Sequence, residues 1–232
     1  MDLTELKKQN YRDNYLQFDP SQYGRIYTFV DFANVRQWAK TFWPNENKLR
    51  LVREIDIAKL YTLISSVSPE KSLFYYGYYK EDPELSERHE HNIRHRKSLY
   101  RISKAQKSGF KTVAKEIKEI KSFDEFGKFI GTVKKCNLDI EIAIDMLTKV
   151  EKYDTVFLWS GDSDFDRLLK HLKVTHKKKV IVVCCRDFMS KELAECADVY
   201  VPADAFKDIL EFINEATPTE VGVANKDEPN IP

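Results

Sequence analysis

The sequence predicts an α/β fold in which a central, mostly parallel sheet carries helices on both faces. Short apolar runs typical of strands alternate along the chain with helical patterns, which is the order found in βαβ units. The runs are continuous rather than alternating, as expected of strands that are buried on both faces. A chain of 232 residues is long enough for one such domain and its core.

The predicted strands are apolar runs rich in β-branched and aromatic residues. They cover Ile26–Asp31, Ser72–Tyr79, Phe110–Ala114, Thr155–Ser160, Lys179–Cys184 and Val199–Val201. Helices are predicted where apolar residues recur three and four positions apart, with Asp56 as a cap and Gly109 as a terminator. They cover Asp56–Val67, Pro83–Lys107, Leu138–Val150, Phe165–Leu172, Lys191–Cys196 and Asp204–Asn214. Irregular structure is expected around Pro44-Asn45, and an irregular or hairpin stretch around Phe126-Gly127.

Three segments are expected along the chain. Residues 1–23 form a polar leader, residues 24–215 the folded domain, and residues 216–232 a tail whose Pro, Gly and charged residues are typical of disorder. The leader lacks the apolar core of a signal peptide, and no apolar run approaches the ~18 residues of a membrane span. Four cysteines without CxxC spacing fit a reducing compartment, so we expect a cytoplasmic protein with no membrane partner. The oligomeric state is open, with a homodimer as one option.

Aspartates follow two of the predicted strands directly. Asp31 ends the first strand, and Asp162 and Asp164 come just after the strand at residues 155–160. The carboxyl ends of parallel strands meet at one edge of the sheet, where ligands of open α/β folds bind. Carboxylates gathered there repel one another and commonly share a proton or a divalent cation. With Asp139 at the start of a helix, they form a candidate site for one or two metal ions.

Three motifs occur in order around these aspartates. Residues 29–34 read Phe-Val-Asp-Phe-Ala-Asn, and residues 160–165 read Ser-Gly-Asp-Ser-Asp-Phe. Between them, residues 135–147 read Lys-Cys-Asn-Leu-Asp-Ile-Glu-Ile-Ala-Ile-Asp-Met-Leu. Together these motifs resemble the NYN domain, in particular its LabA-like branch, within the PIN-like nuclease superfamily. The resemblance covers residues from about 25 to 212, nearly all of the expected domain.

The resemblance implies a Rossmann-like PIN fold and a ribonuclease that uses Mg²⁺ or Mn²⁺, with RNA as its partner and an endonucleolytic reaction. It assigns metal binding and catalysis to four aspartates and a supporting role to two neighbours, with a further aspartate as a fifth candidate ligand. The four are Asp31, Asp139, Asp162 and Asp164; the supporting residues are Asn34 and Ser160; the fifth candidate is Asp145. A cap or a solvated helix face is the alternative for Asp145.

Two positions depart from the family pattern. Phe32 stands where the family often has Gly, and Cys136-Asn137 where it usually has Gly-Val. A bulky Phe32 beside Asp31 would narrow the pocket, so the alternative is a weakly active or inactive PIN-like module that binds RNA or regulates. A small-molecule phosphohydrolase is disfavoured because Asp31 is not the first residue of a D-x-D motif. The absence of a P-loop and of GxGxxG disfavours an ATPase or a dinucleotide enzyme.

A basic region lies between the first and second motifs. Residues 88–121 contain eleven Lys and Arg against three Glu, whereas the whole chain has a net charge of only +1. Arg94, Lys97, Arg101 and Lys104 recur at three- and four-residue steps, so they share one helical face. Such a stripe can hold a phosphate backbone without reading sequence, which predicts nucleic-acid binding; a solvated helix face is the alternative.

Overall fold

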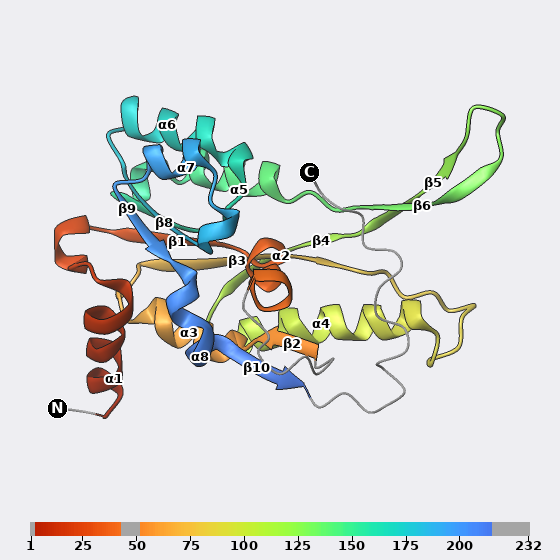
Figure 1. Cartoon of the computed structure of the whole chain (residues 1–232), viewed down its shortest axis with the longest axis horizontal. Coiled ribbons are helices and arrows are strands. Elements are labelled where there is room, and N and C mark those ends of the chain that lie inside the picture. Colours follow the sequence, from red (N-terminus) through yellow and green to blue (C-terminus); the bar gives the residue numbers. More distant parts are fainter. Residues whose placement is uncertain (1–2, 43–51, 215–232) are drawn as a thin grey trace.

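The computed structural model describes residues 3–42 and 52–214, and its centre is a six-stranded sheet (Figure 1). The strand order is β4-β3-β1-β7-β8-β9, and every neighbouring pair is parallel. These strands are β1 Ile26–Asp31, β3 Lys71–Tyr78, β4 Lys111–Glu116, β7 Thr155–Trp159, β8 Lys179–Cys184 and β9 Val199–Pro202. The predicted α/β class is confirmed. The tail expected at 216–232 and the irregular stretch around Pro44-Asn45 lie outside the described residues.

Helices cover both faces of the sheet and divide the core into two clusters (Figure 1). One face carries α5 Asp139–Thr148, α6 Asp166–Val174 and α7 Lys191–Cys196. The other face carries α2 Phe32–Gln37, α3 Ile57–Ser65, α4 Glu90–Ser108 and α8 Lys207–Leu210. Successive residues of β1 point to opposite clusters, Phe29 to the first face and Val30 to the second. Burial on both faces is the physical reason why the strands read as continuous apolar runs.

The N-terminal segment packs on the domain. It contains α1 Leu3–Tyr11, a π-helical turn over Arg12–Leu16 and a 3-10 turn over Pro20–Tyr23. Leu16 is fully buried in the core, and Arg12 Nη1 donates a hydrogen bond to the carbonyl of Ser66 at 2.7 Å. Within the described residues, no helix is both long and apolar enough to cross a bilayer.

The described part of the chain ends with a strand, which corrects the helix predicted over Asp204–Asn214. After a 3-10 turn at Ala203–Phe206 and the single turn of α8, β10 Glu211–Asn214 pairs antiparallel with β2 Val52–Ile55. The backbone N–H of Asp56 also donates to the carbonyl of Leu210 at 2.8 Å. Strand β2 was not predicted, because four residues without a visible partner carry little local signal.

Helix α4 begins at Glu90, so the predicted start near Pro83 was wrong. The side chain of Asn92 donates to the carbonyls of Asp82, Leu85 and Ser86 at 3.0–3.2 Å. These bonds hold residues 82–86 as a loop, and His89 caps the helix by accepting from the backbone of His91. The end of the helix at Gly109, with a φ of +113°, is as predicted.

A hairpin formed by β5 Lys118–Phe123 and β6 Phe129–Lys135 projects from the domain (Figure 1). Its turn is built by Asp124, whose carboxylate accepts the backbone N–H groups of Phe126 and Lys128 at 3.0 and 2.8 Å. Gly127 has a φ of +77°, a conformation that glycine adopts without strain. Of the two options for the stretch around Phe126-Gly127, the structure forms the hairpin. We call it the hairpin arm.

Glu54 of β2 ties three elements together. Its carboxylate lies 3.0 Å from Arg36 of α2 and 2.6 Å from Arg101 of α4, and its side chain is only 12% exposed. Burial by itself would raise the pKa of Glu54, but the two guanidinium groups outweigh burial and hold the pKa at about 2. The charged form is therefore stabilised by folding.

We expect Glu54→Gln to lower the free energy of unfolding by about 3 kcal/mol at pH 7, because it removes the anion that the partly buried guanidinium groups of Arg36 and Arg101 both contact. The folded pKa lies below the unfolded value of 4.5, so the contribution is complete above pH 4.5 and is lost as the pH falls toward 2. Urea unfolding of both proteins between pH 2 and 8 measures this. The exposed pair Lys191–Glu195 supplies the control: Glu195→Gln should change stability by less than about 0.5 kcal/mol. A pH-independent difference for Glu54→Gln would contradict the electrostatic explanation.

Candidate metal centre

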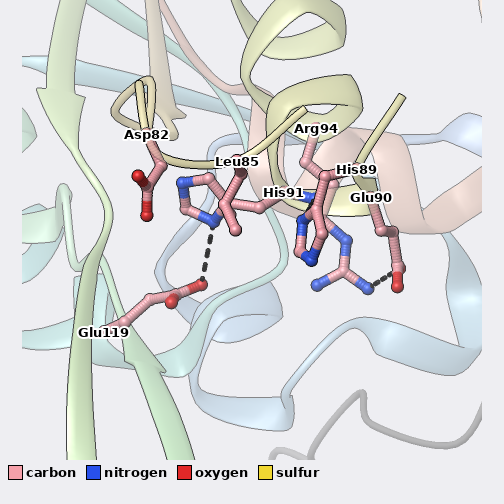
Figure 2. A pocket seen from close by; sticks show the side chains of 7 residues that line it. All are labelled: Asp82, Leu85, His89, Glu90, His91, Arg94 and Glu119. Carbon is pink, nitrogen blue, oxygen red and sulfur yellow. Dashed lines mark hydrogen bonds and ion pairs between the residues drawn. The ribbon is translucent and has the colours of Figure 1, made fainter. Parts of the chain in front are cut away.

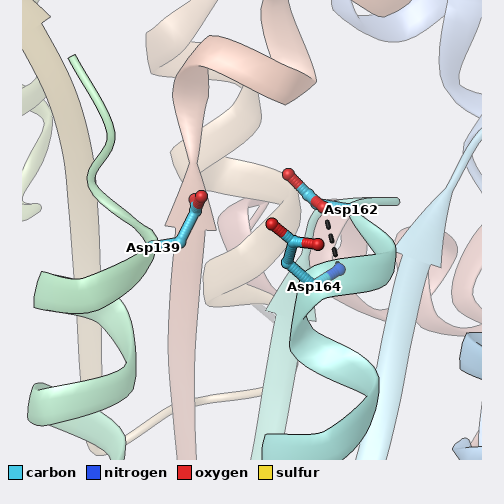
Figure 3. A group of neighbouring side chains, drawn as sticks. All are labelled: Asp139, Asp162 and Asp164. Atoms are coloured by element: carbon cyan, nitrogen blue, oxygen red, sulfur yellow. Dashed lines mark hydrogen bonds between the residues drawn. The ribbon is translucent and has the colours of Figure 1, made fainter. Parts of the chain in front are cut away.

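Three aspartates meet at the carboxyl edge of the sheet (Figure 3). One carboxylate oxygen from each of Asp139, Asp162 and Asp164 lies within 4.8 Å of the other two. Asp139 is the first residue of α5, whereas Asp162 and Asp164 belong to the turn between β7 and α6. Segments that are distant in sequence thus converge at one point, and we refer to these residues as the aspartate triad.

The sheet places Asp31 directly behind this triad. Strands β1 and β7 are parallel neighbours, with Val30 opposite Trp159, so Asp31 and Ser160 leave the sheet side by side. Ser160 Oγ donates to Asp31 Oδ2 at 3.1 Å and accepts the backbone N–H of Asp162 at 3.2 Å. Ser160 therefore links Asp31 to the turn that carries two of the triad carboxylates.

Asn34 and Gly161 also hold the turn between β7 and α6 in place. Asn34 Oδ1 accepts the backbone N–H of Gly161 at 3.2 Å. A Cβ atom on Gly161 would lie 2.2 Å from Cys184 Sγ and 2.8 Å from the carbonyl oxygen of Phe188. Only glycine allows this close approach to the end of β8. Within the turn, Asp162 Oδ1 accepts the backbone N–H of Asp164 at 2.9 Å.

The electrostatics of the site disfavour four charged carboxylates. Burial, together with the nearby charges of Asp139 and Asp162, raises the pKa of Asp31 to about 7, although hydrogen bonds from Asn34 and Ser160 oppose the shift. Burial, followed by repulsion from Asp162 and Asp164, raises the pKa of Asp139 to about 6. The folded protein therefore gathers negative charge that a cation or a proton would neutralise.

The donor set fits a hard divalent cation. Carboxylate oxygens are the preferred protein ligands of Mg²⁺ and Mn²⁺, and Mg²⁺ needs only one or two of them because it retains several waters. Three carboxylates from two rigid elements exceed this requirement. No cysteine or histidine belongs to the triad, so the softer ligands typical of structural zinc sites do not enter it.

Asp145 lies outside the triad, one and a half turns further along α5. One of its carboxylate oxygens accepts a hydrogen bond from the Tyr75 hydroxyl at 2.7 Å, and the other forms an ion pair with Lys149. Its role as a fifth metal ligand stays a prediction, and its observed contacts are structural. The contacts of Asp145 with Tyr75 and Lys149 were not predicted, although the i,i+4 spacing of Asp145 and Lys149 was a usable signal.

Phe32 does not occupy the space in front of the carboxylates. Its side chain is fully buried, and its ring packs 4.5 Å from Phe74 and 5.3 Å from Tyr76, measured between centroids. It belongs to the core cluster beneath α2 and α3, on the face opposite α5. The expectation that Phe32 narrows the pocket was therefore wrong, because the start of α2 turns this side chain into the core.

Three of the four predicted stripe residues of α4 are paired with carboxylates. Arg94 forms an ion pair with Glu90, Arg101 with Glu54, and Lys104 with Asp56 at 3.5 Å. Lys97 also has an interaction within the fold. Nucleic-acid binding by this helix stays a prediction, and Arg101 has a clear structural role instead.

A comparison with models of protein families identifies the family of this chain. The family model described as NYN domain matches residues 25–213. The chain belongs to the NYN domain family. This match spans the whole described sheet and all three motifs, which confirms the family expected from the sequence and its place in the PIN-like nuclease superfamily.

Two known proteins are similar to this NYN domain, one in sequence and one in structure. The Low amplitude and bright protein LabA of Synechococcus elongatus is 34% identical over 103 residues, or 44% of this chain. The match covers 54% of LabA, so the chain spans about half the length of that relative. A solved structure of a protein of unknown function, VPA0982 from Vibrio parahaemolyticus, superposes with a TM-score of 0.56 at 22% identity. It covers 83% of this chain and 99% of the other, and it supports the fold.

We expect Mn²⁺ to raise the melting temperature by about 5 °C or more at a hundredfold excess over its Kd, because binding relieves repulsion within the folded triad.

In EDTA, the raised pKa values of Asp31 and Asp139 mean that the free energy of unfolding falls as the pH rises from about 4 to 7. Asp162→Asn/Asp164→Asn should be more stable than wild type in EDTA at pH 8 and lose the Mn²⁺ shift. Glu192→Gln, at an exposed position on α7, is the control. A full Mn²⁺ shift in the double variant would place the ion elsewhere.

Gly161→Ala should weaken Mn²⁺ binding about 10- to 100-fold while leaving every carboxylate in place, since the methyl group displaces the turn from β8. Calorimetric titration with Mn²⁺ measures the affinity. Ser163→Ala changes an exposed residue of the same turn and should bind normally. Wild-type affinity in Gly161→Ala would show that the turn tolerates this displacement.

Proposed function

We propose that this NYN domain is a metal-dependent ribonuclease, an endonuclease that hydrolyses RNA phosphodiesters at the aspartate triad. The observation that carries the proposal is the convergence of three carboxylates within 4.8 Å at the carboxyl edge of the sheet. Membership of a PIN-like nuclease family supports the reaction class. Mg²⁺ or Mn²⁺ is the proposed cofactor, because both prefer the oxygen ligands that the triad offers.

Each residue has a separate task in this proposal. Asp139, Asp162 and Asp164 would hold the cation, which when bound stabilises the charge that develops on the phosphate oxygens. Asp31, which Ser160 links to the turn that carries two of the triad carboxylates, would accept a proton from the attacking water. Ser160 and Asn34 would hold Asp31 and the turn in place through the hydrogen bonds described above.

The second candidate function is an inactive PIN-like module that binds RNA or regulates. Its main support was Phe32, whose side chain lies buried in the core instead of at the site. All four aspartates of the family pattern are present, and three of them converge. These observations favour the enzyme over the binding module.

We also propose a cytoplasmic location. All four cysteines are free, three of them buried, which suits a reducing compartment.

The test is cleavage of labelled single-stranded and structured RNA by the full chain in Mn²⁺, Mg²⁺ or EDTA. Wild type should cut internally with either metal and not in EDTA, and Asp162→Asn/Asp164→Asn should lose at least about 100-fold in rate because the ion is no longer held. Asp166→Asn, in the same segment but outside the triad, is the matched control and should retain activity. Metal-independent cleavage, or activity that survives in the double variant, would remove this proposal.

A further inference from the structure

The hairpin arm exposes aromatic side chains that a folded domain normally buries. Phe126 at its tip is 87% exposed, and Phe123 and Phe129 are more than half exposed, with their rings 5.9 Å apart. The turn built by Asp124 and Gly127 holds the Phe126 backbone in place. Large exposed apolar groups of this kind mark binding surfaces.

The arm also carries cations that lack ion-pair partners. Within the described part of the chain, Lys118, Lys121, Lys128 and Lys135 are exposed and form no ion pair, in contrast to the paired basic residues of α4. The acidic residues of the arm neutralise little of this positive charge. Glu119 contacts His91 at 3.7 Å, and Asp124 is used by the turn, which leaves Glu125.

The arm projects from the sheet edge that carries the aspartates (Figure 1). Strand β4 runs parallel to β3 and so to β1 and β7, and its carboxyl end leads into β5. Strand β6 returns to the same edge, where only three residues separate Lys135 from Asp139. A strand of six residues spans about 20 Å. The arm therefore continues the surface beside the triad over about this distance.

The base of the arm contacts α4, as Figure 2 shows. Glu119 of β5 faces His91, whose other ring nitrogen lies 2.7 Å from the carbonyl oxygen of Lys80. These contacts join the arm to the loop that precedes α4. The orientation of the arm relative to the sheet edge is therefore supported by side chains and does not depend on the two connecting segments alone.

We propose that the hairpin arm binds single-stranded RNA next to the aspartate triad. Its lysines contact phosphates, and the exposed phenylalanine rings stack on unpaired bases, which are accessible only in single strands. The inference rests on the proposed function in one respect: the bound RNA is the substrate of the triad. The aliphatic residues Ile120, Ile130 and Val133 are also exposed on the arm, so self-association of the chain is the competing use of this surface.

Binding of a fluorescein-labelled single-stranded RNA to the full chain, measured by anisotropy in EDTA, tests the arm without cleavage. Lys118→Gln/Lys121→Gln/Lys128→Gln should weaken binding at least about tenfold and reduce the slope of log K against log salt by about 2, since each lost phosphate contact removes about 0.7. The control Lys7→Gln/Lys59→Gln/Lys152→Gln removes the same charge from exposed positions elsewhere and should bind within about twofold of wild type.

Substitutions of Phe126, at the tip of the arm, distinguish base stacking from general apolar contact. Phe126→Ala and Phe126→Leu should each weaken binding at least about fivefold, whereas Phe126→Trp should retain it. Because Phe126 is almost fully exposed, these variants should keep the wild-type melting temperature. Wild-type affinity in the arm lysine variant and in Phe126→Ala would overturn the proposal. So would a wild-type dimer that becomes monomeric in Phe126→Ala with unchanged RNA affinity, measured by light scattering.

The two proposals fail in different ways. If wild type does not cleave RNA with Mn²⁺ but arm-dependent binding in EDTA persists, the nuclease proposal fails and the arm remains an RNA-binding element. If wild type cleaves RNA and the arm variants bind and cleave like wild type, the nuclease stands and the arm proposal is overturned.

Discussion

Mutual repulsion among carboxylates is the constraint on which the site depends. Strands β1 and β7 are parallel neighbours, so their terminal polar residues emerge at one edge, and α5 brings Asp139 to the same point. Burial of Asp31 and of part of Asp139 increases the unfavourable free energy of the charged state. The fold maintains this arrangement through core packing on both faces of the sheet. A cluster of this kind lowers the stability of the metal-free protein, and its negative charge favours the binding of a cation.

The turn after β7 is held in one conformation by several contacts. Ser160, Gly161 and Asn34 connect Asp31 to Asp162 through hydrogen bonds and close backbone packing. None of these three residues belongs to the aspartate triad, yet each helps to fix the position of its carboxylates. Each residue of the motif Ser-Gly-Asp-Ser-Asp-Phe has a physical reason. In order, the motif supplies a hydroxyl, a close backbone approach, a triad carboxylate, an exposed residue, a second triad carboxylate and the buried ring of Phe165.

The sequence was sufficient to predict the sheet and the triad, and insufficient for features that depend on distant partners. Continuous apolar runs identified all six strands of the main sheet, since burial on both faces leaves a local signal. The pairing of β2 with β10 leaves none, because each strand is short and its partner lies at the other end of the domain. Phe32 was misjudged for a related reason: its position next to Asp31 in sequence said nothing about the direction of its side chain once α2 begins. Arg101 likewise matched a basic stripe by spacing, but its pairing with Glu54 required the tertiary structure.

The contact between β2 and β10 also bears on when the domain can complete its fold during synthesis. The sheet neighbours β1, β3 and β4, with α3 and α4, all lie in the first half of the chain, whereas the partner of β2 is the last described strand. While the C-terminal segment is still in the ribosomal tunnel, β2 has no partner and presents an open edge. The backbone bond from Asp56 to Leu210 and the β2–β10 ladder form only once β10 has left the tunnel. The pairing of β2 therefore waits for the last described strand, and a nascent chain that stalls before residue 211 retains an unpaired strand available to other chains.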